Sequence, residues 1–202
     1  MLTPERKIRI AVFVSGGGTN LQALMDAQKS GIIKSGEIVH VVSDTADAYA
    51  LERAQNNGID TTVVDRKKYP DRESFEKKLI ETLKSNNIEL IILAGFMRIL
   101  GSEIIREYEN RMINVHPSLI PSFCGKGFYG LKVHEAALQK GVKVTGATVH
   151  FVNEIPDGGE IIFQKAVEIE ENDTPETLQL RVMQQAEWVI LPAAVEKVCA
   201  EG

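Results

Sequence analysis

The chain has 202 residues, of which 44% are hydrophobic and 25% charged, as is ordinary for a soluble globular domain of this size. Its net charge of -5 argues against a nucleic-acid or anionic-membrane surface, although a local basic pocket for one phosphate stays open. Cys124 and Cys199 show no metal-ligand spacing and are too few for a disulfide scaffold. The first apolar run, residues 10–14, is too short for a signal peptide or a membrane span. We therefore expect one cytoplasmic domain over residues 1–202, with no metal, nucleic-acid or membrane partner.

The first half of the chain alternates between short apolar runs and amphipathic stretches. Apolar, β-branched runs predict strands, and apolar residues three and four apart predict helices. Gly31 and Gly58 suit the ends of the first two helices. The predicted strands are 8–14, 38–42, 61–64, 90–94 and 113–116, and the predicted helices are 21–30, 48–57, 70–84 and 104–108. Strand 90–94 is the most hydrophobic, so we expect it at the centre of a parallel sheet with helices on both faces.

The pattern changes after residue 118. Residues 119–130 are rich in Pro, Gly and aromatic residues, which indicates a mobile loop, and a short helix follows over 132–139. Strands 144–152 and 161–169 are joined by a Pro-Asp-Gly-Gly turn, which predicts an antiparallel hairpin. Thr174 and Pro175 suit the start of a last helix, which we expect to run to about Cys199 and to bend at Pro192. The expected fold is α/β, Rossmann-like and doubly wound, with a mostly parallel sheet, a C-terminal antiparallel hairpin and a long last helix.

Three successive glycines follow the first strand. Gly16, Gly17 and Gly18 let the backbone approach an anion closely. The amides of Gly18, Thr19 and Asn20 at a helix start can point at a phosphate. The run is neither a Walker loop nor a dinucleotide fingerprint, because no Gly-Lys-Ser/Thr and no third spaced glycine follow. A tight turn without a ligand is the alternative, but three glycines exceed what a turn requires, so we expect a monophosphate here.

The segment Ala-Gly-Phe-Met-Arg-Ile-Leu, residues 94–100, lies at the carboxyl end of the predicted central strand. Ligands of open α/β sheets collect at that edge. An apolar cluster there suits a flat aromatic ligand, and Gly95 would give it room. The alternative is that the apolar core continues past the end of the strand. For Met97, Ile99 and Leu100, the pattern favours a ligand site and core packing equally.

Asn114 and His116 lie two residues apart at the end of a strand that Pro117 must stop. Their side chains therefore point to the same face. An amide and an imidazole together can polarise a carbonyl group and handle a proton. The alternative is a polar strand end that only ties down the next loop.

Asp157 lies in the hairpin turn and is an ordinary turn residue in isolation. If the turn folds back over His116, its carboxylate can orient the imidazole and stabilise the charged form. Other polar and aromatic side chains have weaker claims and are interpreted as structural or solvated from the pattern alone. These are His40, His134, His150, Arg181, Glu187 and Trp188.

Six segments, in order along nearly the whole chain, carry a family resemblance: VSGGGTNLQAL, LAGFMRIL, INVHPSLIPSF, HEAAL, TGATVHFV and DGGEII. The chain resembles the glycinamide ribonucleotide formyltransferases of purine biosynthesis, in their folate-dependent, single-domain form. INVHPSLIPSF with a later Asp-Gly is shared by several formyltetrahydrofolate enzymes. The GGGTNLQ loop is what points to the ribonucleotide as substrate.

The resemblance implies three groups of site residues. It places the catalytic groups at Asn114, His116 and Asp157. It implies binding of the ribonucleotide by Gly17, Gly18, Thr19, Asn20, Arg72, Met97, Ile113 and Glu187. It implies binding of the cosubstrate, 10-formyltetrahydrofolate, by Arg98, Ile99, Leu100, Val152, Asn153, Glu154 and Ile155.

The chain departs from the family pattern near its last helix and in one loop. A family His after the Glu is Trp188 here, and one residue more separates Glu187 from Arg181. Loop 124–131 is a weak match to common members. The implied reaction is direct attack of the ribonucleotide amine on the formyl carbon, with Asn114 and His116 stabilising the oxyanion and Asp157 helping to move the proton.

Three other functions share part of this pattern. Methionyl-tRNA formyltransferases share this chemistry but need a tRNA-binding C-terminal domain, for which an acidic chain of this length leaves no room. Formyltetrahydrofolate deformylases use water as acceptor, typically carry an extra N-terminal domain and lack the GGGTN loop. A non-catalytic sensor of phosphorylated ligands would need the glycine loop but has no use for the Asn, His and Asp together. The sequence leaves open whether the chain forms a homodimer.

Overall fold

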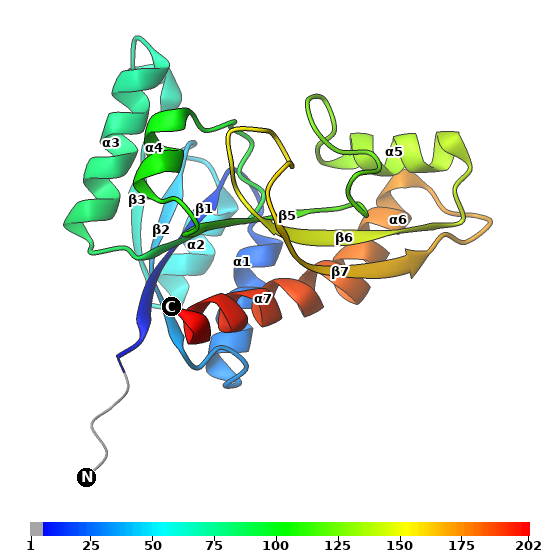
Figure 1. Cartoon of the computed structure of the whole chain (residues 1–202), viewed down its shortest axis with the longest axis horizontal. Coiled ribbons are helices and arrows are strands. Elements are labelled where there is room, and N and C mark those ends of the chain that lie inside the picture. The colour runs from blue at the N-terminus through cyan, green and yellow to red at the C-terminus, as the bar shows by residue number, and fades with distance from the viewer. Residues whose placement is uncertain (1–5) are drawn as a thin grey trace.

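The computed structural model describes residues 6–202, and short strands alternate with helices along the chain (Figure 1). The strands are β1 (Ile8–Val14), β2 (Gly36–Ser43), β3 (Asp60–Val63), β4 (Leu90–Leu93), β5 (Met112–His116), β6 (Val144–Phe151) and β7 (Ile161–Glu168). The α-helices are α1 (Thr19–Lys29), α2 (Tyr49–Asn56), α3 (Arg72–Ser85), α4 (Ser102–Glu107), α5 (Leu131–Lys140), α6 (Pro175–Val182) and α7 (Trp188–Glu201). A 3-10 turn, η1 (Arg66–Lys68), precedes α3.

The strands form one seven-stranded sheet in the order β3-β2-β1-β4-β5-β6-β7. Strands β1 to β5 pair in parallel, and β6 and β7 add antiparallel pairs at one edge. Strand β4 is the fourth of the seven and all its side chains are buried, so the prediction from its hydrophobicity is confirmed. The predicted fold class, with its mostly parallel sheet and C-terminal hairpin, is confirmed as well.

Helices cover both faces of the sheet (Figure 1). One apolar core joins the sheet to α1, α2, α6 and α7, and a second core joins the other face to α3 and α4. In β1, Ile10 and Val12 enter the first core, whereas Ala11 and Phe13 enter the second. A strand covered on both faces must be apolar throughout, which explains the unbroken apolar run in β1.

The helices begin and end at the residues that local chemistry favours. Gly18 precedes α1 in the left-handed conformation, with φ of 71°, which costs glycine little. The side chain of Thr174 accepts a hydrogen bond from the backbone of the third residue in α6, as expected for an N-cap. The helix predicted from residue 70 begins instead at Arg72, because the Asp71 carboxylate accepts a 2.7 Å hydrogen bond from the Ser74 amide.

The last helix is not a uniform α-helix. A π-helical turn, η2 (Met183–Glu187), separates α6 from α7. The sequence did not predict this turn. Pro192, where we expected a bend, lies inside α7 with its side chain in the core. The change of helical geometry therefore lies upstream of the proline, at a turn next to the candidate site.

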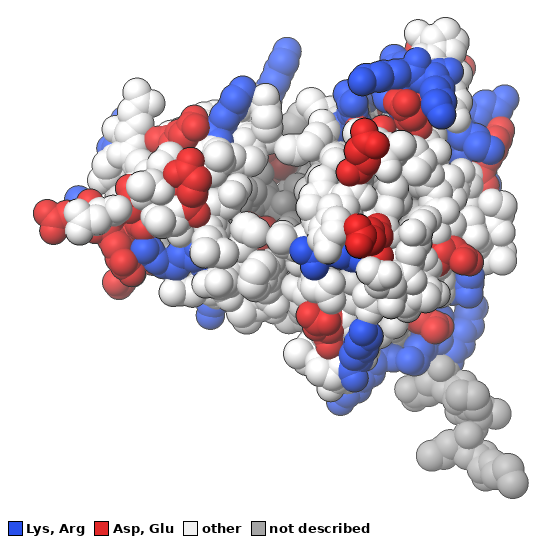
Figure 2. All heavy atoms as spheres, turned by 180° about the vertical axis from the view of Figure 1, so that it is seen from behind, with Lys and Arg blue, Asp and Glu red and all other residues white. Residues whose placement is uncertain are grey.

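Figure 2 shows that Lys and Arg side chains are interspersed with Asp and Glu over one face of the molecule. The same face is hollowed near its middle. Within residues 6–202, no helix has the length and apolar character needed to span a membrane.

Candidate active site

A cavity of about 860 Å³ opens at the carboxyl ends of the central strands. The glycine loop after β1 and the segment after β4 both line it. The chain runs outward from β1 through β2 to β3 and then returns to place β4 on the other side of β1. Ligands of doubly wound sheets bind at such a switch point. The cavity is therefore where the fold itself favours a ligand site.

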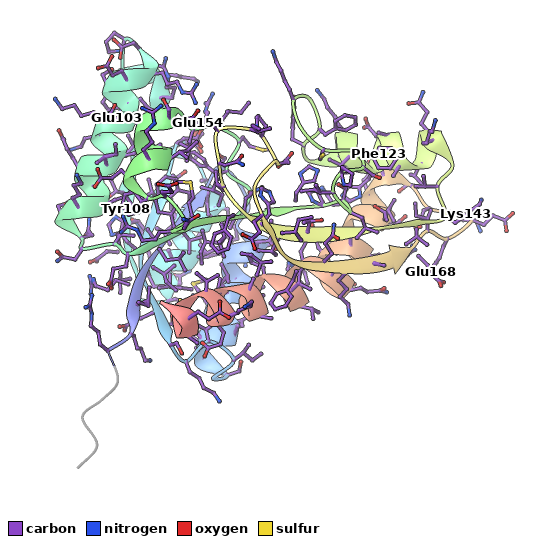
Figure 3. The ribbon with its side chains drawn as sticks, in the orientation of Figure 1. Glu103, Tyr108, Phe123, Lys143, Glu154 and Glu168 are labelled. Carbon is purple, nitrogen blue, oxygen red and sulfur yellow. The ribbon has the colours of Figure 1, made fainter. Side chains whose placement is uncertain are left out.

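Most of the residues expected from the family resemblance line this one cavity. They are Gly17, Gly18, Thr19, Asn20, Met97, Arg98, Ile99, Leu100, Asn114, His116, Val152, Asn153, Glu154, Ile155, Asp157 and Glu187. Figure 3 shows Glu154 on the β6–β7 loop and Phe123 on the loop after β5, on the same side of the sheet. Strand ends and loops that lie far apart in the sequence thus meet at one edge.

Arg72 and Ile113 do not line the cavity. The Ile113 side chain is fully buried in the core, so it offers no surface to a ribonucleotide. The Arg72 guanidinium donates to Glu76 Oε1 at 2.6 Å and to the backbone oxygen of Ile99 at 2.8 Å. These contacts place Arg72 beside the segment predicted for the folate, and binding of the ribonucleotide by Arg72 and Ile113 stays a prediction.

The predicted catalytic side chains come together. Asn114 and His116 point to the same side of β5, and both line the cavity. Asp157 reaches them from the hairpin turn, with Oδ2 at 3.6 Å from His116 Nδ1. The Gly125 amide donates to the same Oδ2 at 2.8 Å. The turn therefore does fold back over the imidazole. From the sequence alone, this position of the turn was an assumption on which the role of Asp157 depended.

The orientation of the His116 ring follows from its partners. His116 Nε2 lies 2.9 Å from the backbone oxygen of Phe123, which can only accept, so Nε2 carries a proton. In the neutral ring Nδ1 is then the unprotonated nitrogen, and it faces the carboxylate of Asp157. A proton added at Nδ1 meets a negative charge there. The arrangement suits an imidazolium ion that shares a site with a carboxylate.

His150 also belongs to the cluster, and sequence reasoning missed it. Its Nδ1 donates to the Phe151 backbone oxygen at 2.8 Å, so its neutral Nε2 accepts from the Asn114 amide at 3.2 Å. The same Nε2 lies 3.6 Å from Asp157 Oδ1. Strand β6 pairs His150 directly with Asn114. The register of the β5–β6 pair was the signal that could have found it, and sequence alone did not supply that register.

Asp157 is held in its anionic form. Burial on its own would raise the pKa of this carboxyl group. The neighbouring His150 ring, the charge of His116 and the Gly125 amide act in the opposite direction and lower the pKa below its usual value. Asp157 therefore carries its negative charge throughout the neutral pH range.

The other two histidines lie outside the cavity lining, as predicted. His40 Nε2 bonds to Thr62 Oγ1 at 2.8 Å between β2 and β3. The His134 side chain on α5 is fully buried, and burial lowers its pKa to about 4. His134 is thus an uncharged ring behind the site at neutral pH.

The glycine loop is shaped by contacts with α2. A Cβ atom on Gly18 would lie 2.6 Å from the Ala50 Cβ, so packing as well as the positive φ requires glycine there. The carbonyl oxygens of Gly16 and Gly17 accept from the Ala50 amide and from Arg53 Nε. With these oxygens turned to α2, the unpaired amides at the start of α1 are left to face the cavity. This is the geometry expected for a phosphate loop.

Glu187 lies on the π turn and lines the cavity next to Asn20, whose Nδ2 donates to Oε2 at 2.6 Å. A π turn accommodates one residue more than an α turn. At the end of this turn, Glu187 lies against the start of α1 through its contact with Asn20. Trp188 begins α7 and does not line the cavity.

Burial raises the pKa of Glu187 to about 7, against a smaller lowering effect of Asn20. The native state therefore keeps a proton that the unfolded chain releases near its ordinary pKa of 4.5. The stabilisation by this proton is complete below about pH 4.5 and is lost as the pH rises to about 7. We predict that the free energy of unfolding falls over this range by about 3 kcal/mol more in the wild type than in Glu187→Gln.

Urea unfolding at pH 5 and pH 8 measures this difference. Glu201→Gln, which changes an exposed carboxylate at the end of α7, is the control and should follow the wild type. Parallel pH curves for the wild type and Glu187→Gln would contradict the prediction.

Exposed apolar side chains surround part of the opening. Met97, Ile99 and Ile155 are all more than half exposed and line the cavity. Apolar groups left at the rim of a cavity are typical of a ligand site. Among residues 6–202, no group of three or more His, Cys, Asp or Glu side chains is arranged to hold a metal ion.

Fold and cavity together define a doubly wound α/β protein with an Asn-His-Asp cluster at its switch point. Residues 8–195 match the family described as formyl transferase. The chain belongs to the formyl transferase family, as its motifs predicted.

Several named proteins are similar over almost the whole chain. The trifunctional purine biosynthetic protein adenosine-3 of Gallus gallus is 44% identical over 96% of this chain, which spans 19% of that relative's length. The chloroplastic phosphoribosylglycinamide formyltransferase of Arabidopsis thaliana is 37% identical over 98% of this chain and 67% of its own length. The crystal structure of glycinamide ribonucleotide transformylase 1 from Symbiobacterium toebii has a TM-score of 0.90 and 42% identity, covering 96% of this chain and 89% of that one.

Proposed function

We propose that this protein transfers the formyl group of 10-formyltetrahydrofolate to the amine of glycinamide ribonucleotide. The observation that carries the proposal is the meeting of three parts in one cavity: the glycine loop, the segment after β4 and the Asn114, His116 and Asp157 cluster. The names of the Arabidopsis thaliana and Symbiobacterium toebii proteins refer to that ribonucleotide, which supports the choice of acceptor. The glycine loop suits its phosphate, and the apolar rim suits a flat heteroaromatic donor.

In the proposed reaction the neutral amine attacks the formyl carbon directly. A carbon–nitrogen bond forms to the amine, and the carbonyl oxygen becomes an oxyanion. The Asn114 amide donates one hydrogen to His150 and has a second to offer this oxyanion. His116 donates from Nε2 when the oxyanion takes the place of the Phe123 carbonyl oxygen.

The intermediate then collapses as the bond between the formyl carbon and N10 of the folate breaks. The amine loses one proton and N10 gains one, so the net transfer is balanced without a covalent enzyme intermediate. Asp157 stabilises the positive charge on His116 while the proton moves. No cysteine is needed as a nucleophile, and burial together with Asp157 raises the pKa of the nearby Cys124 thiol.

The test is turnover of 10-formyltetrahydrofolate by the purified chain, followed by the absorbance change of the folate product. We expect release of tetrahydrofolate that depends on added glycinamide ribonucleotide. Release without the ribonucleotide would indicate a deformylase instead. A protein that binds a phosphorylated ligand but never releases folate would be a sensor. A cytoplasmic location stays a prediction, and size-exclusion chromatography with light scattering decides whether the chain forms a homodimer.

A further inference from the structure

The segment that joins β4 to α4, residues 94–101, contains no helix or strand and yet lines the cavity with all its residues from Ala94 to Leu100. Two of these side chains, Met97 and Ile99, are largely exposed and apolar. Ala94 and Leu100, near the two ends of the segment, are buried, and the Ala94 amide donates to the Phe13 oxygen at 2.9 Å. The exposed middle of the segment must be held by contacts with other parts of the chain.

The strongest of these contacts is an ion pair with β2. Asp44 follows the last residue of β2, and its side chain is only 2% exposed. Its Oδ2 accepts from Arg98 Nε at 2.6 Å, while Oδ1 is buried without a hydrogen-bond partner among the described residues. A buried carboxylate is costly unless it is paired. Arg98 is the partner that balances Asp44, and the pairing holds the segment against the end of β2.

Two further contacts hold the same segment. The Met97 amide donates to Ser15 Oγ at 2.9 Å, which ties the segment to the glycine loop. Glu76 on α3 is also buried and accepts from the Gly101 amide at 2.6 Å. The contact between Arg72 and the Ile99 oxygen described above adds to this second anchor. The segment is thus fixed from the ends of β1 and β2 and from α3, and Asp44 fixes it through the charged side chain of Arg98, a residue that lines the cavity.

We propose that Asp44 is a positioning residue for the formyl donor, acting through Arg98. Asp44 does not line the cavity, so it touches no ligand. It holds Arg98 and the neighbouring backbone in the conformation that receives the flat ring of the donor. The inference rests on the proposed function for the identity of the donor, but the placement of the segment by Asp44 can be measured without any ligand.

The test compares wild type with Asp44→Asn, which keeps the shape of the side chain and removes its charge. The dissociation constant for tetrahydrofolate, measured by isothermal titration calorimetry, should rise about tenfold as a charge-assisted hydrogen bond becomes a neutral one. The KM for the formyl donor should rise with it, while the KM for the ribonucleotide and kcat stay close to wild type. Without ligand, the amides of residues 94–101 should exchange hydrogen faster in the variant.

A second variant, Arg98→Met, distinguishes loss of the Asp44–Arg98 ion pair from any other effect of Asp44→Asn. If Asp44 acts through Arg98, Asp44→Asn raises the dissociation constant in the wild type but adds nothing in the Arg98→Met background. Asp173→Asn is the matched control, because Asp173 is an equally buried carboxylate paired with Arg181 and lies outside the cavity lining. It should lower stability without changing folate affinity.

The possible results separate the inference from the proposed function. Wild-type protein that neither binds tetrahydrofolate nor turns over would overturn the proposed donor and this inference with it. Wild-type binding with an unchanged constant in Asp44→Asn would overturn the inference alone. Equal weakening by Asp173→Asn would show that any lost buried charge has this effect, and would overturn it too.

Discussion

Replacing His116 by alanine is expected to lower kcat at least about a hundredfold, because a lost oxyanion donor typically costs ~3 kcal/mol in the transition state. The ring is nearly buried, its Nε2 proton faces the loop carbonyl of Phe123, and Asp157 lies at 3.6 Å from its other nitrogen. Among the described residues no hydrogen bond joins the glycine loop to this ring, so the affinity for glycinamide ribonucleotide should stay within a few-fold of wild type. Steady-state turnover and calorimetric titration of the ribonucleotide measure the two quantities. Asn114→Ala should behave in the same way.

The control for this experiment is His40→Ala. His40 is also a buried histidine with one side-chain partner, but it lies between β2 and β3 and away from the cavity. It should lose stability and keep its turnover. Turnover of His116→Ala close to that of His40→Ala would show that His116 is structural.

The second large effect is expected for Asp157→Asn, with a loss in kcat of at least about a hundredfold. The amide has the shape of the carboxylate but cannot stabilise the positive charge that His116 carries during proton transfer. Asp157 accepts from the Gly125 amide, and the asparagine oxygen can still do so. The contact between residue 157 and Gly125 should therefore remain, and the loss should fall on kcat rather than on either KM.

Stability against pH gives an independent reading of the same variant. The pKa of Asp157 is lowered in the native state, so its stabilising contribution is complete above about pH 4 and is lost as the pH falls through the native value. The difference in free energy of unfolding between wild type and Asp157→Asn should shrink as the pH is lowered below about 4. Turnover has its own control.

Asp173→Asn, which alters a carboxylate outside the cavity, should keep wild-type turnover. Wild-type kcat in Asp157→Asn would show that the carboxylate has no part in the mechanism.

The sequence determined the order of strands and helices because hydrophobic spacing and helix-ending residues are local. The apolar runs of β1 and β4 required burial on both faces, and only a parallel sheet between two layers of helices supplies that. Three glycines before a helix fixed the place of the phosphate loop. Asn114 and His116 had to share a face because the side-chain period of a strand is two. These inferences needed no knowledge of distant contacts.

What the tertiary structure decided depends on residues far apart in the sequence. Asp157 comes from a turn whose position over His116 follows from the β5–β6–β7 pairing, and the same pairing brought His150 to Asn114. Asp44 meets Arg98 because β2 and β4 flank β1.

The π turn shows the same limit. The spacing of residues in the last helix did not predict a π turn at Met183–Glu187, which brings Glu187 into contact with Asn20. Strand register and side-chain packing depend on contacts between residues far apart in the chain. The periodicity of a single sequence reports only local structure, so it does not predict them.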